Sequence, residues 1–476
     1  QNVLDSVRVG VEDYMLSVGR SESYEAYPEN HILSGERRFL YDMFRRIATR
    51  SESMSHRMYN LCYVYLIIKE KIRGEMIQTN EWVGFENFSI YQGRSGTVAL
   101  DRRLENLKAK MAVASSLQQN VIKLELRITP FVTAEENARE ILNLDEAITT
   151  SDKVREKYYY VVHFIKKKDD YMPWKRYCVP RHTKLRYEIK RKTMALLRMR
   201  EKYPTEARRI LGIAAASQEI GCRPEVFAPC FRTLHSDTKY AYTVEGFERL
   251  PQLRVTYHVG EDFLDVTDGL RAIDEAIHFL NLDCGDRIGH ALALGINVRD
   301  WYKSKNYRIS LPKQDYLDNI VWLYHAIRRF HIEGMDNLKS WLEKEFYQYF
   351  EEVYSRFISG EYIQGIQQYI KENANQGGLN FDIYAYYDAW KLRGDAPELY
   401  RRGFYRERAA YMAPLEENAV NRQFPKEFDI RKKQAVAMLY HHYHYNAGVW
   451  REGRTAVNKK LDLEYVRAVI AVQKAM

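Results

Sequence analysis

Residues 253–262 read LRVTYHVGED, residues 286–290 read DRIGH, and these two stretches decide the predicted fold. The first begins with the alternation of a half-buried strand, and its polar groups gather at the carboxyl end. In a β/α barrel, that end of the strands carries the chemistry. His258 can offer a ring nitrogen to a divalent metal, and Gly260 permits a sharp turn that brings Glu261 toward the metal. A metal-bound water beside a carboxylate is typical of a hydrolase.

A helix is expected between the two stretches, with either Thr267 or Asp268 as its cap. Its apolar positions recur at helical spacing: Leu270, Ile273, Ile277 and Leu280. A strand–helix–strand unit normally places its two strands parallel and adjacent. We therefore expect His258 and His290 at neighbouring strand ends, close enough to share one ligand. The alternative is that each is an ordinary interior histidine, which two matched strand ends make the weaker interpretation.

These motifs resemble the His-x-Gly-Glu and Arg-x-Gly-His signatures of the adenosine deaminase family of metal-dependent amidohydrolases. Residues 124–130 (LELRITP) are similar to the family's third-strand pattern, and residues 212–229 resemble its Gly-Ile-Asp-x-Ala-Gly-x-Glu strand and the loop that follows. The resemblance covers residues 121–300. Within the family, the long insertions and the basic character look most like the large deaminase subunits of the RADAR anti-phage defence system.

The resemblance implies a TIM-type (β/α)8 barrel and the zinc-dependent, hydrolytic deamination of adenosine or adenine nucleotides to the inosine form. His258 would be a ligand of the Zn²⁺, one ion per site. Glu261 would protonate the purine ring and later the departing ammonia, while His290 would orient or deprotonate the attacking water. Ser217 and Glu219 would contact the substrate. A role in anti-phage defence, a large homo-oligomer and a partner ATPase of the defence system are implied as well.

The chain departs from the family pattern in two ways. The His-x-His metal pair of the first barrel strand and the Asp-Asp pair after the eighth strand are both missing. Ala214 and Ser217 stand where the family usually has Asp and Gly. We therefore expect an internal segment of a longer protein, holding about strands two to six of a partial barrel. The other zinc ligands would lie outside this chain, and the segment alone would be inactive.

The predicted organisation has four parts. Residues 1–115 form a helical and loop region that follows the first barrel strand, and residues 116–300 form the barrel core, where strands alternate with helices. Residues 301–460 lose the strand rhythm and are expected to be a large helical insertion, too long for an ordinary loop. Residues 461–476 are expected to be a barrel helix to which the chain returns.

The helical insertion is rich in aromatic residues: Trp322, Trp341, Tyr347, Tyr349, Tyr384, Tyr386, Tyr387 and Trp390. Aromatic side chains are common anchors of protein interfaces, so the insertion is expected to contribute to the contacts of a homo-oligomer. The alternatives are a lid over the site and burial of these aromatics against the chain's own barrel.

Composition favours a reduced, cytoplasmic protein. Five scattered cysteines lack disulfide or metal-ligand spacing, and the longest apolar stretch, residues 61–68, fits a buried helix and is too short to span a bilayer. The net charge of +9, the run Lys166–Lys168 and the basic residues from Arg181 to Lys192 leave nucleic acid as a possible partner without sequence-specific recognition. A solvated helix face is the plainer explanation of the second group.

Two other functions are left open. A scaffold subunit with a catalytically incomplete site would keep the barrel for assembly alone, although the intact His258, Glu261 and His290 argue against it. An amidohydrolase with a non-purine substrate would keep the metal and change the pocket. The pair His442 and His444 is not taken as a metal site, because residues two apart on a helix point in different directions.

Overall fold

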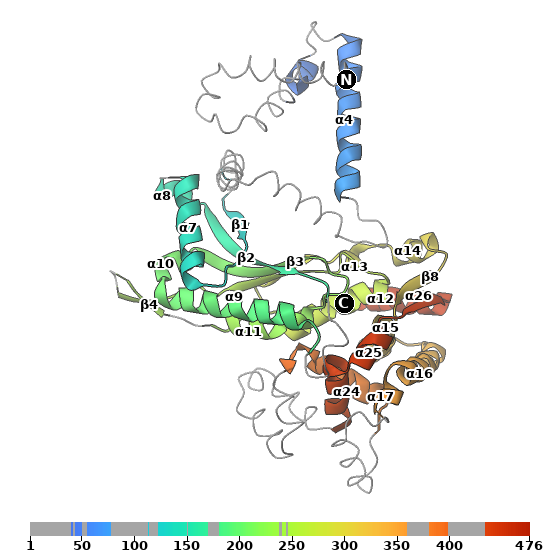
Figure 1. Cartoon of the computed structure of the whole chain (residues 1–476). Helices are drawn as coiled ribbons and strands as arrows, with labels where there is room; N and C mark the ends of the chain where they lie inside the picture. Colours follow the sequence, from blue (N-terminus) through green and yellow to red (C-terminus); the bar gives the residue numbers. More distant parts are fainter. Residues whose placement is uncertain are drawn as a thin grey trace. The chain divides into compact units, whose positions relative to one another are not determined.

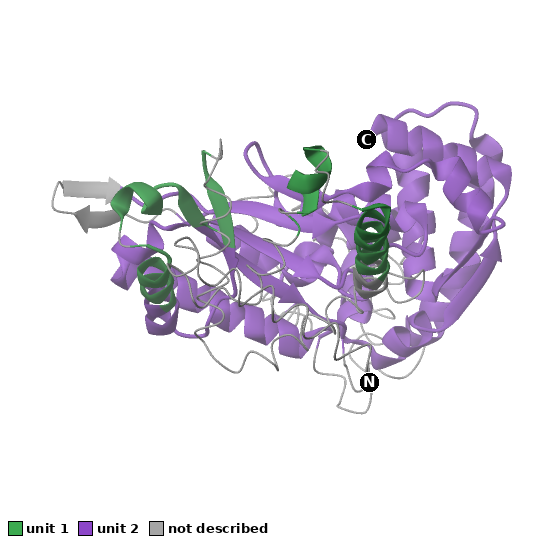
Figure 2. Ribbon diagram, turned by 90° about the horizontal axis from the view of Figure 1, so that it is seen from above, with its two compact units in different colours: residues 1–126, 140–159 green, residues 127–139, 160–476 purple. Residues whose placement is uncertain are grey.

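The computed structural model describes residues 40, 43–49, 55–77, 113, 122–149, 151–169, 180–237, 240–243, 246–358, 380–397 and 434–476. The chain divides into two compact units, and Figure 2 colours them separately. One comprises residues 1–126 with 140–159, and the other comprises residues 127–139 with 160–476. All of the predicted site residues belong to the second unit.

The first unit contains the helix α4 (His56–Ile77) and the short helix α8 (Asp152–Arg155). The apolar stretch 61–68 does lie in a helix, but several of its large side chains are exposed, among them Leu61 and Tyr63. The expectation of a buried helix there was wrong. An apolar run in the sequence indicates that a helix forms. Whether that helix is buried depends on which other segments pack against it in the tertiary structure.

The predicted α/β fold is confirmed by five parallel strands that curl into a half-barrel (Figure 1). In spatial order they are β1 (Leu124–Ile128), β2 (Tyr158–Lys166), β3 (Ile210–Ser217), β6 (Arg254–Val259) and β7 (Arg287–His290). Most residues of the inner strands β2, β3 and β6 are buried, as expected for a sheet covered on both faces.

Helices connect these strands, as the alternating pattern predicts. They are α7 (Ala134–Ile148), α9 (Thr183–Lys202), α10 (Pro204–Ala207), the short η2 (Pro224–Val226), α11 (Ala228–His235) and α12 (Val266–Leu280). Both α11 and α12 pack against β6. One connection was not foreseen: an antiparallel hairpin of β4 (Tyr240–Thr243) and β5 (Gly246–Arg249) lies between α11 and β6 in the chain.

The helix α12 corrects two details of its prediction. It begins at Val266 after Asp265, so Thr267 and Asp268 lie inside its first turn and neither is the cap residue. Leu270, Ile273 and Leu280 are buried as expected, whereas Ile277 is 43% exposed. The helical spacing correctly predicted the buried face of α12, but Ile277, at the edge of that face, points away from the core.

A helical region follows the half-barrel in the chain. Its elements are α13 (Leu292–Gly295), α14 (Val298–Ser304), α15 (Lys313–Arg329), α16 (Asp336–Phe350), the π-helical η3 (Glu351–Ser355), α17 (Arg356–Ile358), α19 (Ile383–Lys391), η5 (Leu392–Gly394), α24 (Gln434–Tyr445), α25 (Ala447–Gly453) and α26 (Leu463–Ala475). The last of these is the helix expected at the end of the chain.

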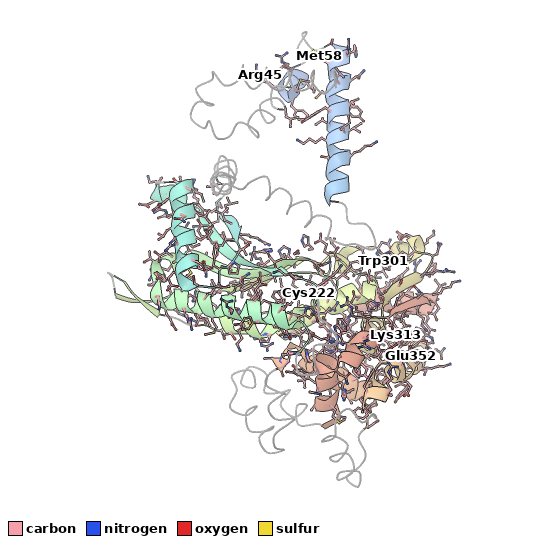
Figure 3. All side chains as sticks on the ribbon, in the orientation of Figure 1. Arg45, Met58, Cys222, Trp301, Lys313 and Glu352 are labelled. Atoms are coloured by element: carbon pink, nitrogen blue, oxygen red, sulfur yellow. The ribbon has the colours of Figure 1, made fainter. Side chains whose placement is uncertain are left out.

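The expectation of a strandless region over residues 301–460 was wrong, because two strands bracket its helices. β8 (Arg308–Pro312) pairs antiparallel with β9 (Ala456–Lys460), from Arg308 opposite Lys460 to Pro312 opposite Ala456. Just beyond β8, Lys313 forms ion pairs of 2.7 Å with Glu452 and 2.9 Å with Glu352, and Figure 3 labels Lys313 and Glu352. The strand pairing and the ion pair between Lys313 and Glu452 therefore hold the two ends of the helical region together.

Several of the aromatic residues expected at an interface are buried inside the second unit. On α12, Asp274 accepts a hydrogen bond of 2.7 Å from Nε1 of Trp322, and Glu275 accepts one of 3.0 Å from Nε1 of Trp390. Tyr349 and Tyr386 are also buried, whereas Tyr347 and Tyr384 are exposed. Part of the aromatic content thus serves packing within the chain.

A buried network of arginines and carboxylates joins α12 to this helical region. Arg271 donates to Glu275 over 2.7 Å and to Asp268 over 2.8 Å. Arg393 holds Asp318 through two hydrogen bonds, of 2.6 and 2.8 Å. Because every one of these charges is buried, each depends on its partner for the solvation that water would otherwise supply.

Among the described residues, no helix is both long enough and apolar enough to cross a membrane.

Candidate active site at the carboxyl end of the half-barrel

The structure brings His258, Glu261 and His290 together. His258 lies in β6 beside Gly289 of β7, and the ring centres of His258 and His290 are 5.0 Å apart. Nε2 of His290 lies 3.2 Å from a carboxylate oxygen of Glu261. A Cβ at Gly289 would come within 2.9 Å of the His258 ring, so glycine is required for this close approach.

The loop that presents Glu261 is held from behind by Glu219. Gly260 adopts φ +78°, and a Cβ there would stand 2.7 Å from the Ile273 side chain, so only glycine fits the turn. One carboxylate oxygen of Glu219 accepts hydrogen bonds from the backbone N–H of Gly260 (2.8 Å) and of Glu261 (3.3 Å). In this structure Glu219 therefore positions the loop, and its predicted contact with substrate stays a prediction.

Ser217 ends β3, and its predicted contact with substrate also stays a prediction. Its φ of +85° lies in the left-handed region that favours glycine, which is the residue the resembled family usually has at this position. A non-glycine residue held in this region is strained, and such strain is common at functional sites.

Burial shifts the pKa values of all three central groups. Burial, and then the nearby carboxylates Glu219 and Asp262, raise the pKa of Glu261 to about 7. Burial and the Arg127 guanidinium lower the pKa of His258 to about 3, and burial also lowers the pKa of His290. At neutral pH both imidazoles are therefore uncharged, while Glu261 is divided between its acid and carboxylate forms.

A buried cation lies beneath this site. Lys166 ends β2, donates from Nζ to the backbone oxygen of His258, and lies 4.5 Å from the centre of the Tyr257 ring. Burial lowers its pKa, and Glu219 partly offsets that effect. Lys166 is only 2% exposed, so this first residue of the run Lys166–Lys168 is not part of a basic surface.

Two further side chains reach His258, and sequence reasoning assigned neither a role. Arg127 of β1 contacts Nε2 of His258 through its guanidinium, and the ring of His163 of β2 has its centre 6.4 Å from that of His258. Burial, followed by Arg127, lowers the pKa of His163 to about 4. The Glu-x-Arg pattern of residues 125–127 was a usable signal for Arg127, whereas nothing in the sequence distinguishes His163.

A small cavity lies behind the loop. It is lined by Lys166, Glu219 and Asp262 together with Cys222, the buried free cysteine labelled in Figure 3. Burial raises the pKa of the Cys222 thiol to about 11, which keeps it protonated and unreactive at neutral pH. Glu261 and His290 are not among the residues that line this cavity.

His258 fits a metal only in part. Its neutral imidazole is the form that binds a metal, but its Nε2 already contacts Arg127. Within the described residues, three donor atoms do not converge around His258. The described part of this site therefore does not make a metal centre by itself.

The possible metal site that the described residues do form lies elsewhere. His235, Asp283 and Asp286 place one donor atom each within 4.8 Å of one another. Asp283 and Asp286 precede β7, so this group lies toward the amino ends of the strands, opposite His258 and Glu261. The sequence prediction missed it, because these residues form no motif and only the fold brings α11 to the start of β7. The arrangement does not fix which metal it holds.

No protein-family model matches the chain, and no curated protein is significantly similar to it.

Proposed function

We propose that this protein is a hydrolytic deaminase of adenosine or adenine nucleotides that works from the carboxyl end of the half-barrel. The observation that carries the proposal is the pair of Glu261 and His290, 3.2 Å apart at the end of adjacent strands, with the pKa of Glu261 at about 7. An acid near neutral pKa beside an uncharged imidazole suits a reaction that must both donate and accept protons at pH 7. The motif resemblance supplies the substrate class.

In the proposed reaction, protonated Glu261 gives its proton to the purine ring nitrogen next to the carbon that bears the amino group. Neutral His290 accepts a proton from the water whose oxygen adds to that carbon. The Glu261 carboxylate then takes the proton of the added hydroxyl and passes it to the amino group. The C–N bond breaks to release ammonia, and the proton held by His290 returns to Glu261. Proton transfer by a positioned side chain is worth roughly 10² to 10⁴ in rate.

Zinc belongs to the proposal through the resemblance. When bound, it would lower the pKa of a coordinated water to about 7. His258 is the residue proposed to hold it, and its further ligands would come from outside the described residues. The geometry and the pKa shifts of Glu261 and His290 support the roles proposed for them.

Glu261→Gln in the full-length protein tests the proposal. Glutamine keeps the shape and loses the titrating proton, so we expect conversion of adenosine and ATP to fall by about 10² to 10⁴. The measurement is inosine-form product and ammonia release, with folding checked by thermal unfolding. Glu333→Gln, at an exposed position outside the site, is the matched control and should keep full activity. Near-normal conversion by Glu261→Gln would remove this residue from the mechanism.

A scaffold subunit is the second candidate, and the contact of Arg127 with Nε2 of His258, the predicted metal ligand, favours it. Full-length protein supplied with zinc that converts no adenine compound would support the scaffold. Conversion of other cyclic amides or amidines in the same assay would indicate an amidohydrolase with a non-purine substrate.

Assembly remains part of the proposal. Among the described residues of the helical region, Tyr347 and Tyr384 are exposed aromatic side chains that could contribute to a homo-oligomeric contact. A partner ATPase, anti-phage defence and weak, sequence-independent binding of nucleic acid are proposed on the resemblance and the net charge of +9 alone.

A further inference from the structure

His235, Asp283 and Asp286 form a compact group at the amino end of β6 and β7. Nε2 of His235 lies 3.5 Å from an oxygen of Asp286 and 3.9 Å from an oxygen of Asp283. Donor atoms around a tetrahedral ion with bonds of about 2.1 Å lie about 3.4 Å apart. The two distances are therefore close to those of a metal site and too long for hydrogen bonds between the same atoms.

The imidazole supplies the second, independent observation. His235 is 5% exposed, and its Nε2 is buried without a hydrogen-bond partner in the described chain. A buried ring nitrogen without a partner destabilises the fold, and native structures rarely leave one in that state. This nitrogen is aimed at the two carboxylates, so an ion between them would satisfy it.

The carboxylate of Asp286 is already oriented for this purpose. One oxygen accepts the backbone N–H of Val255 over 2.8 Å, and the other accepts the backbone N–H of Asp283 over 2.9 Å. Carboxylates that bind metals are commonly fixed by such hydrogen bonds and retain lone pairs for the ion. The side chain of Asp286 is 1% exposed, so its orientation does not depend on solvent.

Two neighbours set the electrostatics of the group. His235 is the last residue of α11, and the carboxyl end of a helix favours a cation. Arg254 is the cation present, and its guanidinium lies 2.9 Å from Asp283. Its side chain is 43% exposed, so it approaches from the more solvated side and leaves the buried side of the group to His235.

We propose that His235, Asp283 and Asp286 bind one divalent transition-metal ion, Mn²⁺ or Zn²⁺, that has a structural role. One imidazole nitrogen with two carboxylate oxygens suits these ions, whereas Mg²⁺ and Ca²⁺ prefer oxygen alone. The ion joins the end of α11 to the start of β7. Arg254 and His258 are four residues apart along β6, roughly 13 Å at strand spacing, so this site is separate from the proposed active site.

The test is metal binding by the chelator-treated, full-length protein. Mn²⁺, Zn²⁺, Mg²⁺ and Ca²⁺ are titrated separately, and bound ion per chain and thermal midpoint are measured. We expect His235→Asn and Asp283→Asn to weaken one Mn²⁺ or Zn²⁺ equivalent at least tenfold and to abolish its stabilisation of the fold. Asp283 is 56% exposed, which makes its variant the milder one for folding. His331→Asn, at an exposed histidine, is the matched control and should bind as wild type.

The outcomes separate this site from the deaminase proposal. His258→Asn should keep the ion held by His235, whatever it does to activity. The structural site is overturned if wild type binds no such ion, or if both variants bind Mn²⁺ and Zn²⁺ as tightly as wild type does. Binding of Mg²⁺ and Ca²⁺ by wild type as tightly as Mn²⁺ and Zn²⁺ would show an acidic surface without a role for the imidazole, which also overturns it.

Discussion

The second unit contains two groups of buried charges, and they differ in how completely each charge is paired. In the arginine–carboxylate network, burial alone would lower the pKa of Arg393 and raise that of Asp318. Their mutual ion pair reverses both shifts. At the carboxyl end of the strands, burial prevails: the pKa values of Glu219 and Glu261 are raised and those of Lys166 and His258 are lowered.

This difference indicates how to distinguish buried charges that stabilise the fold from buried groups that donate or accept protons in a reaction. A fully paired charge stays ionised over the whole physiological range and contributes rigidity. Burial that is not offset by a partner moves a pKa toward the neutral form of the group, and at Glu261 it brings the pKa to about 7, where acid–base chemistry requires it. The direction of the pKa shift, compared with what burial alone would give, is the distinguishing quantity.

The largest expected effect comes from breaking the paired network. Asp318→Asn leaves the buried Arg393 without its counter-charge, and we expect a loss of about 3–5 kcal/mol in the free energy of unfolding. Chemical denaturation measures it. Asp336→Asn is the matched control: its side chain is 87% exposed in an ion pair with Lys339, and the expected change is below about 1 kcal/mol. Equal effects of the two substitutions would show that pairing in the network is not what stabilises it.

A smaller and more specific effect is expected at the site. Lys166 lowers the pKa of Glu261 and Glu219 raises it, so removing either charge should move that pKa in opposite directions. We expect Lys166→Met to raise the pKa of Glu261 and Glu219→Gln to lower it. The pH profile of kcat/KM, or direct titration of the Glu261 carboxyl, measures both. Shifts of the same sign in the two variants would contradict the proposed electrostatics.

The smallest effect concerns stability and pH. Below about pH 4.5 the Glu261 carboxyl is protonated in both states, and between 4.5 and about 7 only the folded state keeps the proton. The free energy of unfolding should therefore fall as pH rises through this window, through the contribution of this group. Unfolding midpoints across pH 4.5–7.5 should decline less steeply in Glu261→Gln. Identical slopes in variant and wild type would place the pKa of Glu261 near its ordinary value.

Sequence reasoning correctly predicted the structural features that local sequence patterns encode. The alternation before His258, the glycines at 260 and 289 and the helical spacing of α12 are local signals, and they were sufficient for the strand–helix–strand unit and for the meeting of His258, Glu261 and His290. The half-barrel was predicted from the repetition of such strand–helix–strand units along the chain. The chemical roles of these side chains stay predictions. Their geometry restricts which roles they can have, and an activity assay is needed to assign one.

What sequence reasoning missed depends on contacts between distant segments. Lys166 and Arg127 reach His258 only once the order of β1, β2 and β6 is known. His235 meets Asp286 because a helix end and a strand start coincide in space, and neither segment carries a motif for it. The pairing of β8 with β9 is likewise invisible, since each strand has only five residues and its partner lies far along the chain.

The pairing of β8 with β9 brings the two ends of the helical region together. Pro312, where the chain leaves, stands opposite Ala456, where it returns, so the segment between them starts and finishes at one place. The entropy of closing such a segment grows slowly with its length, about 0.6 kcal/mol for each doubling. The connections between these helices can therefore change in length at little cost, provided that the buried pairs with α12, such as Trp322 with Asp274, are kept.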